Sequence, residues 1–274
     1  MIRQDSATNA DLRRAVAQRL ESLERAGVTS LPKPRQKTGA AADRAATVPT
    51  ASSGELPSLM NSHSTPPPAA GMQLFEGGAE HSLVPPTERP ILLDIIRNEV
   101  AGCTRCSELA ASRTQTVFGV GDPNARLMFV GEAPGADEDR RGEPFVGRAG
   151  QLLTRIIEAC KLRRDDVYIA NVLKCRPPDN RTPLPDEVLN CRGYLERQID
   201  IIRPEMICCL GAIAAQTVLN STVSIGRLRG TFHDYQGIPV VCTYHPSYLL
   251  RNPDAKRFVW DDMKMLMKRM GVEL

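Results

Sequence analysis

The chain has 274 residues, enough for one or two domains, and its formal net charge is +3 at pH 7. This charge does not by itself indicate a nucleic-acid partner, because a near-neutral soluble protein fits it equally well. Residues 1–19 lack the apolar core of a secretory signal, and no run approaches the roughly 18 apolar residues of a membrane span. We therefore expect a cytoplasmic protein with no membrane association.

Residues 1–30 contain one amphipathic helical pattern. Thr8 and Asp11 resemble a capping box at its start, and Gly27 is a typical stop signal. The apolar residues that would share one face are Leu12, Val16, Leu20 and Leu23. A short helix of this kind suggests a docking peptide for a protein partner. The alternative is a weak helix that packs loosely on its own domain.

Residues 31–88 have the composition of a disordered linker. Ten of the 21 prolines lie between residues 32 and 90, among runs of Ala, Ser, Thr and Gly. A segment with so few apolar residues cannot bury enough surface to offset the entropy lost on ordering. We expect a disordered N-terminal extension that precedes a single folded domain at 89–274.

From residue 89 onward, strand-like and helical patterns alternate. Short apolar runs typical of buried strands occupy 127–130, 167–172, 206–210 and 239–243. Helical patterns occupy 91–101, 148–160, 186–202, 212–220 and 254–270. This alternation predicts an α/β fold in which a parallel sheet is covered by helices on both faces.

Four of the eight cysteines have a spacing that suggests a metal site. They are Cys103, Cys106, Cys175 and Cys191. Four thiolates brought together by folding would suit a [4Fe-4S] cluster or zinc, and only the C-x2-C pair is a recognised local signature. The alternative is that they are buried apolar thiols, as we expect for the other four, which end a helical pattern or lie in apolar runs.

Polar or glycine-containing segments follow each of the four predicted strands. They are the loop 131–135, Asn171, Gly211 and His245. Because ligands of open α/β sheets bind at the carboxyl ends of the strands, these residues should meet at one edge of the sheet. The pattern predicts a site for a small planar ligand there, although many α/β proteins have polar strand ends.

Three residues near that edge have both functional and structural interpretations. His245 could donate a hydrogen bond to a developing anion, or it could be a structural histidine. Asn171 offers the donor and acceptor needed to read a base edge, or it could cap a turn. Phe145 lies on a loop between prolines and glycines, where it could stack on a base or anchor the core.

Four segments carry a resemblance to a known family. They are 131–139 (GEAPGADED), 144–153 (PFVGRAGQLL), 171–178 (NVLKCRPP) and 245–253 (HPSYLLRNP). With the four cysteines, they make residues 91–271 closely resemble the family 4 uracil-DNA glycosylases, the iron–sulfur branch of the uracil-DNA glycosylase superfamily. The resemblance covers about two thirds of the chain and does not extend to residues 1–88.

The resemblance implies a three-layer fold with a central four-stranded parallel sheet flanked by helices. It implies a [4Fe-4S] cluster on Cys103, Cys106, Cys175 and Cys191. The implied activity is hydrolysis of the N-glycosidic bond of deoxyuridine in DNA, with uracil released by base flipping and an abasic site left behind. The implied partner is uracil-containing DNA, bound by a monomer.

Roles in the base pocket also follow from the resemblance. Phe145 would stack on the flipped uracil, Asn171 would bind its Watson–Crick edge, and His245 would stabilise negative charge on its O2 atom. The backbone from Gly131 to Ala133 would line the pocket. In the DNA minor groove the resemblance places Tyr248, Leu249, Leu250 and Arg251, with one of the two leucines filling the gap left by the flipped nucleotide.

The residue that orients the hydrolytic water is left open. The best-known branch of the superfamily has an aspartate where this chain, like other family 4 members, has Ala133. The candidates here are Asn180, Glu132 and Glu138. A largely dissociative cleavage needs little help from a base, because stabilising the leaving group supplies most of the rate.

Two other functional classes remain as alternatives. One is an iron–sulfur redox or electron-transfer protein without glycosylase activity, which would not need Phe145, Asn171 and His245 at one edge. The other is a catalytically silent DNA-binding module held together by zinc.

Overall fold

The computed structural model describes residues 84–274. The predicted helix at 1–30 and most of the predicted linker at 31–88 lie outside the described residues. Residues 84–88 lead directly into the first described helix, α2 (Arg89–Ala101). No helix between residues 84 and 274 combines the length and the apolar character needed to cross a bilayer.

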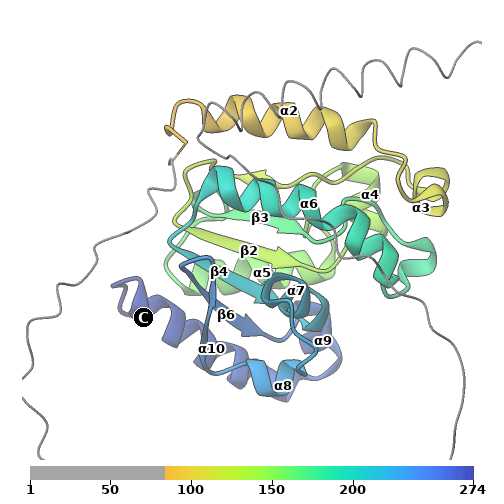
Figure 1. Cartoon of the computed structure of the whole chain (residues 1–274). Coiled ribbons are helices and arrows are strands. Elements are labelled where there is room, and N and C mark those ends of the chain that lie inside the picture. The colour runs from red at the N-terminus through yellow and green to blue at the C-terminus, as the bar shows by residue number, and fades with distance from the viewer. Residues whose placement is uncertain (1–83) are drawn as a thin grey trace, which may run out of the picture. The chain divides into compact units, whose positions relative to one another are not determined.

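A six-stranded mixed sheet forms the centre of the domain (Figure 1). Its strands are β1 (Val120–Gly121), β2 (Leu127–Gly131), β3 (Tyr168–Asn171), β4 (Met206–Leu210), β5 (Phe232–Tyr235) and β6 (Ile238–Thr243), in the order β1-β3-β2-β4-β6-β5. The pairs β3–β2, β2–β4 and β4–β6 are parallel. The edge strands β1 and β5 pair antiparallel with their neighbours.

The predicted four-stranded parallel sheet is therefore corrected to a mixed sheet of six strands. Both additional strands are edge strands that carry little hydrophobic signal. Strand β1 has only two residues, and β5 contains His233 and Asp234. The β5–β6 hairpin turns through Gln236 and Gly237, which both have positive φ, as favoured two-residue hairpin turns require.

Helices cover both faces of the sheet. The side chains of Met128 and Val130 on β2 pack in one hydrophobic cluster with α2, α6 (Pro185–Ile202) and α7 (Ala212–Leu219). Leu127 and Phe129, which alternate with them, pack in a second cluster with α5 (Arg148–Ala159), α9 (Pro246–Arg251) and α10 (Lys256–Arg269). This alternation is the two-residue period of a strand buried on both faces.

All five predicted helices are confirmed, with ends within two residues of the observed ones. The remaining elements are short: α3 (Ser107–Ser112), α4 (Ala136–Arg141), α8 (Ile225–Leu228) and the 3-10 turns Arg164–Asp166, Pro178–Asn180 and Pro253–Ala255. Such elements, like α9, are too brief to show a helical period.

The parallel register places several strand ends at one edge of the sheet. Gly131 at the end of β2 pairs with Asn171 at the end of β3. Leu210 at the end of β4 pairs with Thr243 at the end of β6, immediately before Gly211 and Tyr244. The predicted convergence of loops at this edge is confirmed.

Candidate active site

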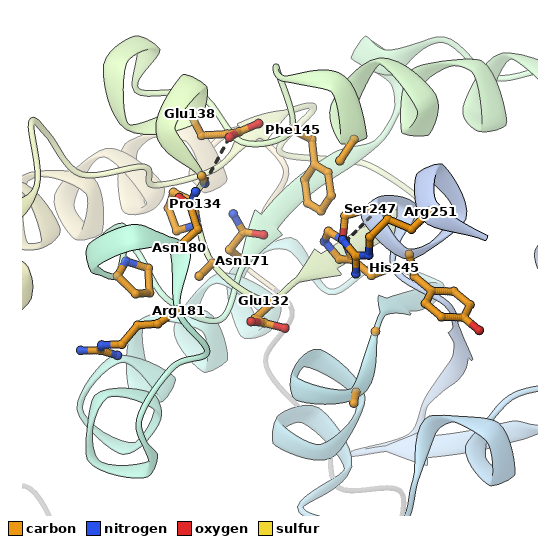
Figure 2. A pocket seen from close by; sticks show the side chains of 17 residues that line it. Glu132, Pro134, Glu138, Phe145, Asn171, Asn180, Arg181, His245, Ser247 and Arg251 are labelled. Atoms are coloured by element: carbon orange, nitrogen blue, oxygen red, sulfur yellow. Dashed lines mark hydrogen bonds between the residues drawn. The ribbon is translucent and has the colours of Figure 1, made fainter. Parts of the chain in front are cut away.

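A cavity of about 360 Å³ opens at the carboxyl edge of the sheet. Residues that follow β2, β3, β4 and β6 line it, together with Phe145 and part of the loop 177–181. Figure 2 shows Phe145, Asn171 and His245 around the same space, although each comes from a different segment of the chain. The structure thus brings together the three residues singled out from the sequence.

Gly131 allows two of these side chains to approach each other. A Cβ atom at this position would collide with both Asn171 Oδ1 and the Phe145 ring. The absent side chain therefore leaves room for the amide and the aromatic ring to lie over the end of β2. Ala133 lines the cavity and is half-buried, whereas Gly131 is not among the lining residues.

Phe145 is held in an uncommon backbone conformation. Its φ is 53°, in the left-handed region, and its side chain is only 6% exposed. A Cβ at Gly150 would collide with the Phe145 carbonyl, so the loop depends on a glycine inside α5. Such strain persists where the surrounding structure enforces it, and it is concentrated at functional sites.

Asn171 presents an unsatisfied acceptor to the cavity. The residue is 2% exposed, and its Oδ1 atom has no hydrogen-bond partner among residues 84–274. An unpaired buried polar atom costs about 1–3 kcal/mol. The arrangement is therefore suited to a ligand that brings a hydrogen-bond donor.

His245 is oriented by the start of α9. Its Nδ1 atom accepts a hydrogen bond from the backbone N–H of Ser247 at 3.1 Å and lies 2.8 Å from the Ser247 hydroxyl. Burial, assisted by the Arg251 cation and opposed by Glu138, lowers the pKa of His245 to about 4. The ring is therefore neutral near pH 7, and because Nδ1 accepts from an N–H group, the ring proton belongs on Nε2.

The aromatic neighbour of His245 is Phe145. The two ring centroids are 5.5 Å apart, with an angle of 35° between the ring planes. Sequence reasoning missed Ser247, whose backbone and hydroxyl set the tautomer. Pro246, a typical first residue of a helix, is the signal that could have indicated His245 as the N-terminal cap and Ser247 as the donor to it.

The carboxylate of Glu138 connects two loops of the site. It accepts hydrogen bonds from the backbone N–H groups of Gly135 (3.1 Å), Val146 (2.9 Å) and Gly147 (2.9 Å). These bonds hold the loop after β2 against the loop that carries Phe145. They also occupy the lone pairs that a general base would use, so the geometry disfavours Glu138 in that role.

The other two candidates for orienting water differ in exposure. Glu132 lines the cavity, its carboxylate accepts no hydrogen bond within the described part of the chain, and burial raises its pKa. Asn180 is exposed at the cavity rim, and its Oδ1 atom accepts a hydrogen bond from Arg176 Nε at 2.8 Å. Glu132 therefore has the more available acceptor.

The residues expected to contact DNA lie on α9. Tyr248 and Leu250 are 39% and 37% exposed, and Arg251 is also exposed. Leu249 is only 1% exposed and packs in the hydrophobic cluster beneath α9. Of the two leucines proposed to fill the gap in DNA, Leu250 therefore faces outward and Leu249 packs inside.

The four predicted metal ligands converge on a second cavity. Cys103, Cys106, Cys175 and Cys191 line it together with apolar residues such as Leu109 and Leu173. Within residues 84–274, no three Cys, His, Asp or Glu side chains form a group that could hold a metal ion. The structure thus shows that the four cysteines line one cavity. That they bind a metal group together remains a prediction.

Nitrogen donors surround the sulfur atoms of this cysteine cavity. Arg113 Nη1 lies 3.0 Å from the Cys175 sulfur, and the backbone N–H of Lys174 donates to the Cys191 sulfur at 3.3 Å. Asn190 Nδ2 donates to the Cys106 sulfur at 3.6 Å. Hydrogen bonds of this kind stabilise negative charge on sulfur, so the donor set fits a thiolate-bound group.

Comparisons with known proteins lead to the uracil-DNA glycosylases. The model of the uracil DNA glycosylase superfamily matches residues 118–264, more than half of the chain. A type-4 uracil-DNA glycosylase from Thermotoga maritima is 46% identical over 190 residues, which cover 67% of this chain and 98% of the relative.

Two further relatives show how similarity falls between branches. A type-4 uracil-DNA glycosylase from Archaeoglobus fulgidus is 44% identical over 187 residues, covering 65% of this chain and 94% of the relative. A type-5 uracil-DNA glycosylase from Pyrobaculum aerophilum is 29% identical over 208 residues, with 64% and 91% covered. The chain therefore belongs to the type-4 uracil-DNA glycosylases of the uracil-DNA glycosylase superfamily.

Proposed function

We propose that the cavity receives a uracil base flipped out of DNA and that the enzyme releases it by hydrolysing the N-glycosidic bond. The uracil-DNA glycosylase activity in DNA repair follows from the family. A base stacked in a duplex cannot reach a cavity lined by strand ends, so the nucleotide must first be extruded. The product is an abasic site.

The observation that carries this proposal is the unpartnered Oδ1 atom of Asn171. The Watson–Crick edge of uracil presents an N3–H donor between two carbonyl oxygens. Asn171 Oδ1 can accept from N3–H while its Nδ2 donates to O4. The base thus supplies the hydrogen bond that this buried amide lacks, and Phe145 provides an aromatic ring beside it.

His245 supplies stabilisation of the leaving base. Negative charge develops on uracil O2 as the glycosidic bond breaks, and a neutral imidazole with its proton on Nε2 can donate to that oxygen. A preorganised donor of this kind typically contributes about 10²–10³ in rate. Glu132 is the candidate that accepts a hydrogen bond from the attacking water, because its carboxylate is free and faces the cavity.

Helix α9 is proposed to engage the DNA around the extruded nucleotide. Leu250 would fill the vacated position in the stack, and Tyr248 and Arg251 would contact the minor groove. Their outward position on the helix that His245 caps would couple DNA engagement to entry of the base into the cavity.

A [4Fe-4S] cluster is proposed on Cys103, Cys106, Cys175 and Cys191. Hydrolysis involves no oxidation or reduction, so the cluster would have a structural role. It would act as a cross-link between the segment before α3 and the segment from β3 to α6. The loop 176–181, which contributes to the cavity wall, lies between Cys175 and Cys191. The cross-link would hold that wall in place.

The cellular compartment, the oligomeric state and the protein partner of the enzyme are also proposals. All eight cysteines are free, which suits a reducing compartment such as the cytoplasm. The proposal also takes the enzyme to act on DNA as a monomer. A protein partner for residues 1–30 remains part of the proposal.

Incubation with a uracil-containing oligonucleotide, followed by alkali and strand sizing, tests the proposed reaction. Asn171→Ala and His245→Ala should each lower the single-turnover rate by about 10²–10³, as loss of one preorganised donor does. DNA affinity should change little, because phosphate contacts dominate it. Equal losses in affinity and rate would instead assign these residues to DNA positioning. Iron and sulfide analysis of anaerobically purified protein distinguishes the cluster from zinc.

A further inference from the structure

Lys174 is a buried lysine that the proposed chemistry does not use. It is 1% exposed, and no carboxylate between residues 84 and 274 pairs with its ammonium group. Burying a lysine without a paired carboxylate is costly, so its polar contacts must compensate. Nζ donates to the Asn171 carbonyl at 2.8 Å and to Gln198 Oε1 at 2.6 Å, and it lies 5.9 Å from the centre of the Phe118 ring.

The contact with Asn171 completes the hydrogen bonding of one peptide unit. The N–H of that unit belongs to Val172 and donates to the Gly131 carbonyl at 2.9 Å. Its C=O belongs to Asn171 and accepts from Lys174 Nζ. With both ends bonded, the peptide plane after Asn171 cannot rotate freely. The direction of the Asn171 side chain is therefore restricted at the point where β3 ends.

The partner on the other side of Lys174 is itself anchored. Gln198 is fully buried on α6, and its Nε2 atom donates to the Phe118 carbonyl at 3.1 Å and to the Tyr168 hydroxyl at 3.2 Å. The ammonium group thus connects the end of β3 to a satisfied network between α6 and the sheet. Satisfied buried networks hold their members in one geometry.

We propose that Lys174 is a positioning residue for uracil recognition, in which its ammonium group fixes the Asn171 carbonyl and so aims the Asn171 amide at the base. The inference rests on the proposed role of Asn171. Lys174 lies behind the strand end and does not line the cavity. Its effect on the reaction must pass through Asn171, and a small displacement of a positioned group can cost about 10² in rate.

A double-mutant cycle tests this coupling. Lys174→Met keeps the length and apolar stem of the side chain but removes the donor to Asn171. Its single-turnover rate should fall by about 30- to 100-fold, with an unchanged half-saturating DNA concentration. In an Asn171→Ala background, Lys174→Met should lower the rate by less than about threefold, because the group that it positions is already gone.

Gln198→Leu is the matched control. It disrupts the same buried network and should lower the melting temperature similarly, but it leaves the Lys174–Asn171 hydrogen bond in place. Lys174 then loses one of its two polar anchors but keeps its bond to Asn171, so the rate should fall less than in Lys174→Met, within about fivefold of the wild type. Iron content measured on every variant identifies any loss that arises from Cys175, the neighbour of Lys174.

The outcomes separate the inference from the proposed function. Additive rate losses in the double variant, or equal losses in Lys174→Met and Gln198→Leu, would overturn the positioning role. Full activity of Asn171→Ala would instead overturn the proposed function of Asn171. If Lys174→Met does not accumulate as folded, iron-containing protein, Lys174→Leu, which also lacks a donor, replaces it in the cycle under the same criteria.

Discussion

The cavity at the carboxyl edge of the sheet (the base cavity) and the cysteine cavity share the segment 171–175, which contributes Asn171 to the first and Leu173 and Cys175 to the second. The two cavities differ in whether their polar atoms have hydrogen-bond partners. In the base cavity, Asn171 Oδ1 has no partner and the Glu132 carboxylate accepts no hydrogen bond from the described residues. In the cysteine cavity, nitrogen donors already reach three of the four sulfur atoms.

This difference separates a transient ligand from a permanent one. A site that binds and releases its ligand keeps polar atoms available, at a cost of about 1–3 kcal/mol for each buried unpaired group. A site that holds a group permanently supports its charge with fixed donors. We therefore propose that the unpaired polar atoms mark the reactive cavity and that the hydrogen-bonded sulfurs mark a structural site.

The largest effect should come from the cysteine cavity. Cys175→Ala should lose iron, solubility and activity together, because one ligand of the proposed cross-link is removed. Iron content and soluble yield measure this. Cys160→Ala is the control, since Cys160 is also buried but lies outside the cavity, and burial raises its pKa to about 11. Full cluster occupancy in Cys175→Ala would refute the ligand assignment.

A second prediction concerns the pH dependence of the base cavity. Burial raises the pKa of Glu132, so its carboxylate becomes protonated at a higher pH than an ordinary glutamate as the pH falls. His245, with a pKa of about 4, stays neutral through that range. The acid-side loss of rate should therefore follow Glu132 and be absent above about pH 5 in Glu132→Gln. Single-turnover rates between pH 4 and 8 measure it, and an unchanged acid limb in this variant would exclude Glu132.

A third prediction contrasts the neighbouring leucines of α9. Leu249→Ala should lower the free energy of unfolding by about 2–5 kcal/mol, because it opens a cavity in the core. Leu250→Ala should change stability by less than about 0.5 kcal/mol. Leu250→Ala should instead slow uracil release. The loss of rate should be about tenfold greater on duplex DNA than on single strands, where no stack has to be filled. Equal losses on both substrates would rule out the wedge role of Leu250.

The smallest effect should come from the N-terminal extension. Deleting residues 1–85 should leave single-turnover cleavage within about tenfold of the full chain, equivalent to about 1.4 kcal/mol. Every residue proposed to bind the base, the DNA or the cluster follows residue 100. A larger loss with the cluster retained would mean that the extension takes part in DNA engagement or chemistry.

Sequence reasoning predicted the elements that have strong local patterns. The five longer helices and the four central strands each bury a regular set of apolar side chains, and this periodicity is visible without any tertiary information. The edge strands β1 and β5 were missed because one is too short and the other too polar. Their pairing depends on neighbours that are distant in the sequence or reached through a turn.

The candidate site was predictable only in part, for the same reason. Parallel strands must place their carboxyl ends together, so the meeting of Asn171 and His245 followed from the order of elements. The order of elements did not predict which polar atoms at this edge lack hydrogen-bond partners. Glu138 became a link between two neighbouring loops, and Leu249 became a core residue, only when the folded chain brought other residues against them.

The sequence by itself determined the alternation of strands and helices, the edge at which the cavity lies and the family to which the chain belongs. Tertiary structure alone decided the burial that lowers the pKa of His245, the availability of Glu132 and the contact of Lys174 with Gln198. The reason is physical. Hydrophobic periodicity is a local property of the chain, whereas burial and hydrogen-bond partners are set by segments that meet only when the whole domain has folded.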